Sequence, residues 1–164
     1  MSVENVREHL ARFGVEGRMQ LFTESSATVE LAAAVLGVIP ARIAKTLSFR
    51  TPDGAMLVVA AGDAKVDNKK FREKFGFKAK MLSPDEVFEL TGHPVGGVCP
   101  FAVNDGVEVY LDSSLQRFAT VFPAVGSPSS AIELTCPELF TCSLAREWVD
   151  VCKLPPEEKE TEIN

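Results

Sequence analysis

A lysine interrupts the apolar face of a predicted strand. Residues 44–50 alternate as a β-strand does, with successive side chains pointing to opposite faces. Lys45 therefore shares a face with Leu47 and Phe49, where charged groups are rare unless they are paired or used. If this strand lies at an edge, the ammonium group reaches water instead. The pattern alone does not decide between a surface lysine and a functional one.

A loop rich in glycine and proline is the second feature with chemical potential. Its sequence is Gly92-His93-Pro94-Val95-Gly96-Gly97-Val98-Cys99-Pro100. Adjacent glycines let a ligand approach the main chain, and prolines near both ends restrict the shape of the loop. Successive amide N–H groups of such a loop can bind a carbonyl oxygen or a developing oxyanion. An ordinary turn between a helix and a strand is the alternative interpretation.

Two further groups of residues are less specific candidates. His93 and Cys99 lie in one loop, which suggests a cysteine nucleophile with a histidine base in a small-molecule hydrolase. No motif of a known cysteine hydrolase surrounds them, so this hypothesis has the least support. Residues 126–130, with the sequence Gly-Ser-Pro-Ser-Ser, are equally consistent with a pocket wall and with a plain turn.

The composition is that of a globular protein, since 46% of the 164 residues are hydrophobic and 24% are charged. A chain of this length can form one domain with one core. No apolar run approaches the roughly 20 residues that span a bilayer, and the N-terminus lacks a secretory pattern, so a cytoplasmic protein is expected. The chain has four cysteines and two histidines without a Cys-x-x-Cys pair, so neither a metal nor another cofactor is expected.

The net charge of −6 is unevenly distributed. Residues 65–80 hold seven basic residues against Asp67 and Glu73, a net of +5 from 7 − 2. The basic residues are Lys65, Lys69, Lys70, Arg72, Lys74, Lys78 and Lys80. This stretch is either a solvated helix face or a contact for a few phosphates, too short to coat a long DNA duplex. Residues 154–164 are predicted to form an acidic, flexible tail.

The elements that position these residues are read from periodicity, caps and turn residues. Four helices are predicted: residues 2–13 with Ser2 as cap, a helix that ends at Leu36 with Ser25, Ser26 or Thr28 as cap, residues 68–75 with Asn68 as cap and residues 83–90 with Ser83 as cap. A helical turn at Pro40 and a short helix near 137–140 are also predicted. Strands are predicted over residues 19–22, 44–50, 55–61, 77–81, 107–111, 120–125, 131–134 and 147–151. Helices and strands alternate early and strands follow one another later, which favours a mixed sheet with peripheral helices.

In their order along the chain, these segments resemble the YbaK/prolyl-tRNA-synthetase-associated (ProX-like) family. The resemblance is carried by Ala34-Val35-Leu36-Gly37-Val38, Ile43-Ala44-Lys45-Thr46-Leu47, Gly62-Asp63, Gly96-Gly97-Val98-Cys99-Pro100, Val109-Tyr110-Leu111-Asp112, Ser114-Leu115 and Gly126-Ser127-Pro128. It implies a mixed α/β (α+β) fold, in which a compact, barrel-like mixed sheet carries peripheral helices. A single editing domain is expected over residues 1–153.

The resemblance also implies an activity. Members of the family hydrolyse the ester of mischarged tRNA, and this chain resembles the free-standing, trans-editing aminoacyl-tRNA deacylases, without a metal or other cofactor. The expected substrate is tRNA-Pro bearing a small non-cognate amino acid. The expected partners are the acceptor end of that tRNA and prolyl-tRNA synthetase, with no membrane and no DNA. A catalytically silent module that binds tRNA or a protein is the alternative.

By the same resemblance, Lys45 is the essential lysine, which anchors the terminal adenosine and the aminoacyl ester. The amides of Gly96 and Gly97 hold the scissile carbonyl. Further substrate contacts are expected from Thr46, His93, Val98, Pro100, Asp112 and Ser127, and tRNA contacts from Lys65, Lys69, Lys70 and Arg72. Some subgroups have Asn where this chain has Thr46, so the amino acid that is removed stays open.

Overall fold

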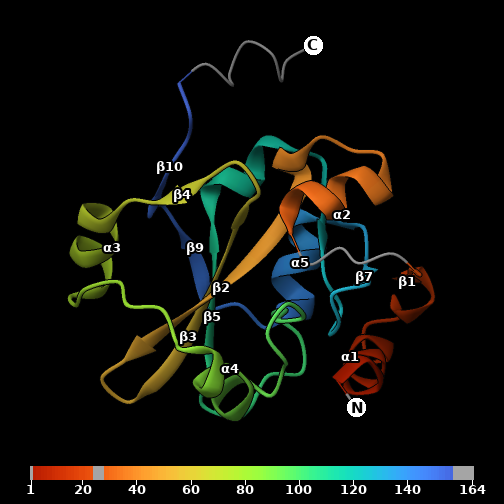
Figure 1. Ribbon diagram of the computed structural model, residues 1–164, viewed down its shortest axis with the longest axis horizontal. Helices are drawn as coiled ribbons and strands as arrows, with labels where there is room; N and C mark the ends of the chain where they lie inside the picture. The colour runs from red at the N-terminus through yellow and green to blue at the C-terminus, as the bar shows by residue number, and fades with distance from the viewer. Residues whose placement is uncertain (1, 24–27, 157–164) are drawn as a thin grey trace.

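Six strands form the sheet that carries the rest of the molecule. In the computed structural model, which describes residues 2–23 and 28–156, their order is β8-β6-β2-β3-β5-β9. The bounds are β2 Ile43–Thr51, β3 Gly54–Ala61, β5 Glu108–Asp112, β6 Thr120–Pro123, β8 Leu134–Thr135 and β9 Glu147–Val149. β2 and β3 form an antiparallel hairpin, whereas β6 runs parallel to β2, β5 to β3 and β9 to β5. The sheet is therefore mixed, and it is curled, so that β2 passes obliquely across β5 in Figure 1.

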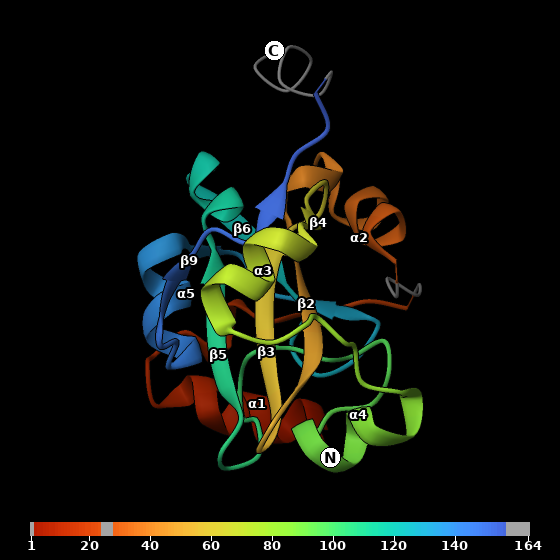
Figure 2. The ribbon, with the colours of Figure 1, turned by 90° about the vertical axis from the view of Figure 1, so that its left-hand side faces the viewer.

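Helices surround this sheet, which confirms the predicted fold class. Their bounds are α1 Ser2–Ala11, α2 Val29–Leu36, α3 Asn68–Phe75, α4 Pro84–Thr91 and α5 Cys136–Ser143, with short 3-10 turns at Glu16–Arg18, Pro40–Arg42 and Ser113–Arg117. Two small antiparallel pairs complete the fold, β1 Gln20–Leu21 with β7 Ser130–Ala131 and β4 Lys65–Val66 with β10 Cys152–Lys153. Figure 2 shows α3 lying across one face of the sheet, with α1 and α4 at the same end of the molecule.

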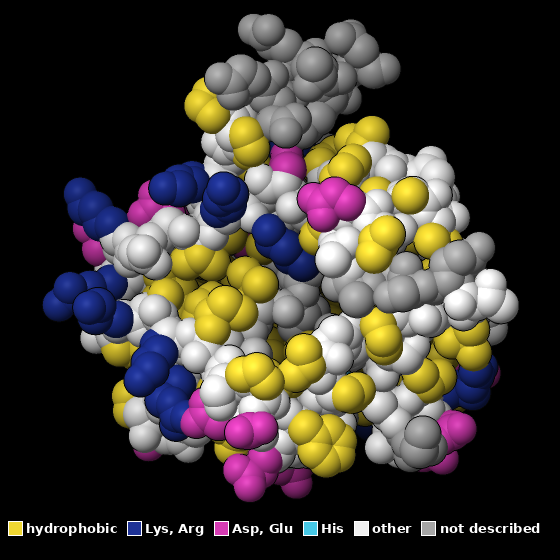
Figure 3. Space-filling model, viewed as in Figure 1, with side chains coloured by type: hydrophobic (Ala, Val, Ile, Leu, Met, Phe, Trp, Pro, Cys, Tyr) yellow, Lys and Arg dark blue, Asp and Glu magenta, His cyan; other side chains and the backbone are white. Residues whose placement is uncertain are grey.

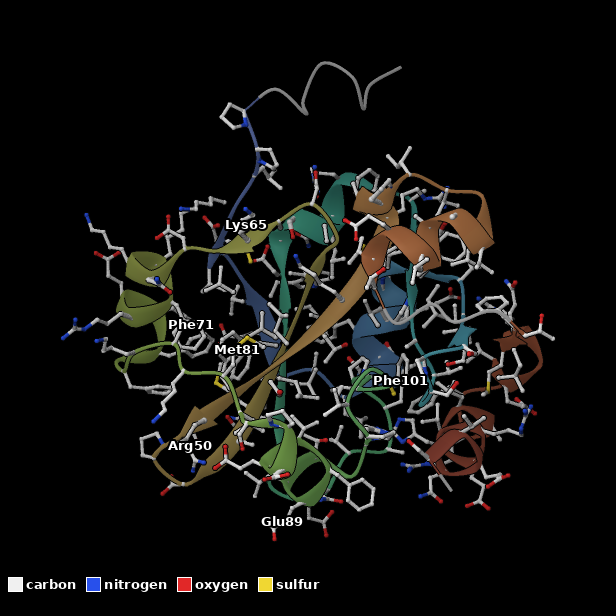
Figure 4. The ribbon with its side chains drawn as sticks, in the orientation of Figure 1. Arg50, Lys65, Phe71, Met81, Glu89 and Phe101 are labelled. Atoms are coloured by element: carbon white, nitrogen blue, oxygen red, sulfur yellow. The ribbon has the colours of Figure 1, made fainter. Side chains whose placement is uncertain are left out.

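The centre of the core is β3, in which every residue from Ala55 to Ala61 is buried. Helix α3 covers it with Phe71, a side chain that is fully buried and points toward the sheet (Figure 4). The Phe71 ring centroid lies 4.9 Å from that of Phe49 and 4.7 Å from that of Phe75. Because aromatic rings bury large apolar areas and pair favourably, this cluster fixes α3 against β2 and β3.

Most predicted helix ends are confirmed. The hydroxyl of Thr28 caps α2, and Gly37 ends that helix in the left-handed conformation with φ of 71°. The two other candidate cap residues, Ser25 and Ser26, lie outside the described residues. Ser83 forms the predicted capping box with Glu86 at the start of α4. These contacts are local in sequence, which is why the residue pattern predicts them.

Other predicted elements are wrong in extent or detail. Residues 77–81 form no strand and make only an isolated bridge between Met81 and Phe49. The predicted strand 131–134 is divided between β7 and β8, and the strand predicted over 147–151 ends at Val149. In each case the tertiary pairing partner, and not the local sequence, sets the strand end.

Two helix predictions also need correction. The cap of α3 is Asp67 and not Asn68, because its carboxylate accepts hydrogen bonds from the amides of Lys69 and Lys70 at 3.0 and 3.1 Å. The short helix predicted at 137–140 is α5, which a second capping box lengthens from Thr135. Residues 157–164 of the predicted acidic tail lie outside the described residues. Within the described part of the chain, no helix is long and apolar enough to cross a membrane.

The buried ring of Phe71 gives a stability prediction. Replacing Phe71 by alanine is expected to reduce the free energy of unfolding by about 3–5 kcal/mol, since it leaves a cavity among packed rings. Urea denaturation followed by circular dichroism measures this loss. Phe88→Ala is the matched control, because the Phe88 side chain is 63% exposed and its loss should change stability by only about 0.5 kcal/mol. Equal losses in the two variants would contradict the packing described.

Candidate functional site

The ammonium group of Lys45 is turned toward the segment that follows β3. Its Nζ donates hydrogen bonds to the carbonyl oxygens of Gly62, at 3.3 Å, and of Ala64. The side chain is half-buried, and this burial lowers the pKa of Lys45 below its ordinary value, partly offset by the negative groups around it, which include Asp63. The two carbonyl oxygens accept hydrogen bonds from the Lys45 side chain and carry no net charge of their own.

The segment that receives Lys45 is itself held tightly. At Gly62 a Cβ atom would overlap the carbonyl oxygen of Pro40, so only glycine fits this approach. Asp63 forms an ion pair with Arg117 at 2.6 Å, and its side chain is only 7% exposed. Sequence reasoning identified Gly62-Asp63 as a family landmark but missed Arg117, which lies 54 residues further along the chain. No local pattern marks such a contact.

A pocket of about 250 Å³ opens beside Lys45. It lies between α2, the start of β2, the glycine loop, β6 and β7, and it is lined by Thr28, Val29, Ala32, Leu36, Ile43, Ala44, Lys45, Thr46, Gly96, Val98, Phe122, Ala124, Ser130 and Ala131. Most of these side chains are apolar. The face of the molecule in Figure 3 is hollowed near its centre, where hydrophobic side chains are exposed. Lys45, Thr46, Thr28 and Ser130 thus bring polar groups to a small cavity whose other side-chain walls are apolar.

The two central glycines of the loop play different parts. Gly96, with φ of 87°, lines the pocket. Gly97 donates its amide to the carbonyl oxygen of Pro94 at 3.0 Å, so this predicted donor is already used within the loop. A Cβ atom on Gly97 would lie 2.8 Å from the Cα atom of Ser127, and glycine is therefore required for packing. Gly96 and Val98 both line the pocket, and within the described part of the chain neither amide donates a hydrogen bond.

His93 does not line the pocket, although a contact with substrate was predicted for it. Its hydrogen bonds instead tie the glycine loop to neighbouring segments. Its side chain is 1% exposed, and its Nε2 donates to the carbonyl oxygen of Phe101 at 2.7 Å while its Nδ1 accepts from the hydroxyl of Ser2. Burial lowers the pKa of His93. Ser2 and His93 are separated by 91 residues, so the sequence pattern could not pair them.

Cys99 is poorly placed to be a nucleophile. Its Sγ lies 3.6 Å from Nε2 of His93, but that nitrogen already donates its proton to Phe101. The thiol is fully buried, and burial raises the pKa of Cys99 to about 12. A buried thiol that stays protonated is unreactive, since the thiolate is the nucleophilic form. The geometry therefore gives no support to the cysteine-hydrolase hypothesis.

Three other predicted contacts lie outside the pocket. Asp112 is 1% exposed and accepts hydrogen bonds from the amides of Ser114 and Val151, each at 2.9 Å, so it fixes the end of β5. Ser127 shapes the turn before β7, because its hydroxyl accepts from the amide of Ser129 at 3.2 Å. Pro100 is buried and borders a different cavity. Asp112, Ser127 and Pro100 do not line the pocket that contains Lys45.

That second cavity is larger, at about 740 Å³, and lies between α1 and residues 102–109. Charges of both signs line it, including the pair Arg146 and Glu108 at 3.4 Å. It contains neither Lys45 nor the pocket-facing glycine. We assign the candidate site to the smaller pocket because three predicted segments meet there. These are residues 45–46, residues 96–98 of the glycine loop and Ser130 of the segment 126–130.

The basic stretch divides into residues that are tied by ion pairs and residues that are not. Lys70 contacts Asp150 at 3.2 Å, and Lys74 contacts Glu147 at 3.0 Å. By contrast, Lys69, Arg72 and Lys78 line a groove of about 520 Å³ beside α3, and they form no ion pair with another described residue. Lys65, on β4, is also exposed (Figure 4). Figure 3 shows Lys and Arg side chains gathered along the flank of the hollowed face on which α3 lies in Figure 1.

No metal site is evident in the described part of the chain, where no three His, Cys, Asp or Glu side chains gather closely enough to hold an ion. The polar side chains that line the pocket are those of Thr28, Lys45, Thr46 and Ser130, beside the main chain of Gly96 and Val98.

Comparison with known proteins places this geometry among related molecules. Residues 23–142 match the model of the aminoacyl-tRNA editing domain. The chain is 58% identical over 154 residues to the uncharacterized protein YwhH of Bacillus subtilis (strain 168), covering 93% of this chain and 98% of that protein. It is 26% identical over 142 residues to a proline–tRNA ligase of Thermosipho melanesiensis, covering 86% of this chain but only 25% of the ligase. A crystal structure of a proposed trans-editing enzyme for prolyl-tRNA synthetase superposes with a TM-score of 0.84 and 29% identity, covering 93% of this chain and 97% of that one.

The buried cysteine gives a prediction about reactivity. At pH 8 a thiol with a pKa of about 12 is almost wholly protonated, so Cys99 should not react with a disulfide reagent such as Ellman's reagent in the folded protein. Comparison of the thiol titre of the wild type and of Cys99→Ser measures this. The two titres should be equal in buffer and differ by one thiol in denaturant. A rapid reaction of Cys99 in buffer would show that the thiol is accessible and activated.

Proposed function

Because the chain belongs to the family of aminoacyl-tRNA editing domains, we propose that it is a trans-editing deacylase that hydrolyses the ester of mischarged tRNA. The observation that carries this proposal is the half-buried side chain of Lys45, which lines a small pocket together with Gly96 and Val98, two residues whose amides donate no hydrogen bond within the described part of the chain. This arrangement suits a ligand with an anionic or electron-rich end and a small apolar group. An aminoacyl ester on the last nucleotide of a tRNA has both.

In this proposal Lys45 anchors the terminal adenosine and the aminoacyl ester, and the amino acid side chain enters the pocket. The amides of Gly96 and Val98 point at the ester carbonyl and stabilise the oxyanion that forms when water attacks the carbonyl carbon. The bond to the ribose oxygen then breaks, and that oxygen takes up a proton. The family resemblance named Gly97 as a second donor, but its amide is already bonded to Pro94. In this proposal Gly97 lets the loop pack closely on Ser127, which fixes the positions of Gly96 and Val98.

The groove formed by Lys69, Arg72 and Lys78 is the proposed contact for phosphates of the acceptor stem. Lys and Arg side chains gather on the α3 flank of the hollowed face (Figure 3), which supports a path for the tRNA end beside α3. Lys65 is a further candidate on the same side. Lys70 was also predicted to contact tRNA. It is ion-paired with Asp150, so it is less available for a phosphate than Lys65, Lys69 and Arg72.

The proposed substrate is tRNA-Pro that carries a small non-cognate amino acid. Two observations support this choice: the similarity to proline–tRNA ligases and to the proposed trans-editing enzyme, and a pocket volume of about 250 Å³, which favours short side chains. The similarity to a proposed trans-editing enzyme for prolyl-tRNA synthetase supports action in trans, with prolyl-tRNA synthetase as the partner. A module that binds tRNA without hydrolysis is the alternative that the first experiment separates.

The first prediction concerns Lys45. Lys45→Ala should lower the rate of deacylation of mischarged tRNA-Pro by about 10²–10³-fold, because the anchoring charge is removed. The measurement is the release of labelled alanine, cysteine or serine from tRNA-Pro. Lys153→Ala, an exposed lysine on β10, is the control and should keep wild-type activity. If the wild type hydrolyses none of these substrates yet still binds tRNA, the silent module is the correct description.

The second prediction concerns the basic groove. Replacing Lys69 and Arg72 by alanine should weaken tRNA binding and reduce the slope of log K against log salt by about one for each phosphate that the variant no longer binds. Lys74→Ala is the matched control on the same helix, because Lys74 is already paired with Glu147. Binding isotherms between 50 and 200 mM salt measure the slope. Across this range the affinity for tRNA is expected to fall by about tenfold or more. An equal change in the control would place the tRNA elsewhere.

A further inference from the structure

The side chain of His93 joins the two ends of the glycine loop. His93 is the second residue of that loop, and its Nε2 lies 2.7 Å from the carbonyl oxygen of Phe101, the residue that follows the loop. The amide of His93 also donates to the hydroxyl of Thr91 at 3.1 Å, and that hydroxyl donates to the carbonyl oxygen of Val87 in α4 at 2.6 Å. Because His93 is only 1% exposed, a lost partner would not be replaced by water. The loop is thus closed by a buried side chain and tied to a helix.

The position of the proton on the His93 ring depends on Ser2. A carbonyl oxygen can only accept a hydrogen bond, so Nε2 of the neutral ring carries the proton that is shared with Phe101. Nδ1 is then an acceptor, and its donor is the hydroxyl of Ser2 at the start of α1. The hydrogen bond at one ring nitrogen determines which tautomer is present at the other. Ser2 therefore favours the tautomer that closes the loop.

The backbone at both ends of this chain of hydrogen bonds is constrained. A Cβ atom on Gly126 would lie 3.0 Å from the carbonyl carbon, the carbonyl oxygen and the hydroxyl of Ser2, so the main chain approaches Ser2 closely. At the other end Ala102 has φ of 54°, a left-handed conformation that is unfavourable for a residue other than glycine. Such a conformation persists only where neighbouring contacts determine the backbone. The bond from His93 to Phe101 is a contact of this kind.

We propose that Ser2 and His93 are positioning residues for the deacylase reaction, which hold the glycine loop in the shape that the reaction requires. Neither residue lines the pocket, so neither touches the substrate. They act through the loop amides of Gly96 and Val98, which are aimed at the ester carbonyl. Donors aimed at a developing oxyanion lose much of their effect when they are displaced by about 1 Å. This inference rests on the proposed deacylase function and adds two residues to it.

The first test separates positioning from stability. Ser2→Ala removes the hydroxyl and Ser2→Thr keeps it, while Val6→Ala is the matched control on α1, because Val6 is a fully buried apolar residue of the core. kcat and KM are measured on mischarged tRNA-Pro at a temperature at which every variant is folded. Ser2→Ala should lower kcat by about 10- to 100-fold and change KM by less than about twofold, since only an interaction made in the transition state is weakened. Ser2→Thr should restore kcat, and Val6→Ala should lose stability without losing kcat.

A double variant tests whether Ser2 acts through His93. Glutamine at position 93 keeps an N–H donor near the place of Nε2 but offers no acceptor at the place of Nδ1. In His93→Gln, the further change Ser2→Ala should therefore alter kcat by less than about twofold, since residues of one hydrogen-bonded unit are not additive. Losses that multiply in the double variant would contradict an action of Ser2 through His93.

Hydrogen exchange of the free protein gives a readout that needs no substrate. The amide of Gly97 donates to Pro94 within the loop, so its exchange rate reports how often the loop opens. This rate should rise by about tenfold in Ser2→Ala and much less in Val6→Ala. An unchanged kcat in Ser2→Ala, or equal losses of kcat in Ser2→Ala and Val6→Ala, overturns the inference. If the folded wild type releases no amino acid from mischarged tRNA-Pro, the deacylase proposal itself fails, and the exchange rate of Gly97 still decides whether Ser2 orders the loop.

Discussion

The half-buried ammonium of Lys45 is the interaction on which the site depends. A charge that loses part of its hydration must be compensated, and here the carbonyl oxygens of Gly62 and Ala64 do so. Those carbonyls stay in place because Gly62 packs on Pro40 and because Asp63 is paired with Arg117. Neutral oxygens leave the positive charge available, which a carboxylate in direct contact would not. The curled sheet, the turn after β3 and the 3-10 helix after β5 thus converge on one cation.

Close backbone approaches then fix the opposite wall of the pocket. Gly97 packs on Ser127, and Gly126 approaches Ser2, whose carbonyl carbon lies 3.0 Å from the position of a Cβ atom on Gly126. The hydroxyl of Ser2 is hydrogen-bonded to His93, a residue of the glycine loop. The start of α1, the turn before β7 and the glycine loop therefore form one packed unit. Interiors packed at this density transmit small displacements, so residues without contact to a ligand still set the position of Gly96 and Val98.

Local chemistry predicted much of this structure. The capping box at Ser83, the left-handed Gly37 and the β2–β3 hairpin follow from neighbouring residues, and the strand alternation drew attention to Lys45. Long-range contacts could not be predicted. The bond between Ser2 and His93 and the Asp63–Arg117 pair each depend on segments far apart in sequence. For the same reason His93 and Asp112, which the family resemblance named as substrate contacts, are buried and hydrogen-bonded to groups within the protein.

The central claim is that the aminoacyl end of a tRNA binds between Lys45 and the glycine loop. The most direct measurement is an NMR titration of 15N-labelled protein with a non-hydrolysable amide analogue of seryl-adenosine. The account predicts that the amide resonances of Thr46, Gly96 and Val98 shift together and saturate at one affinity, while those of Asn104 and Arg146 in the larger cavity stay unchanged. Saturable shifts confined to the larger cavity, with none at the loop or on β2, would contradict it.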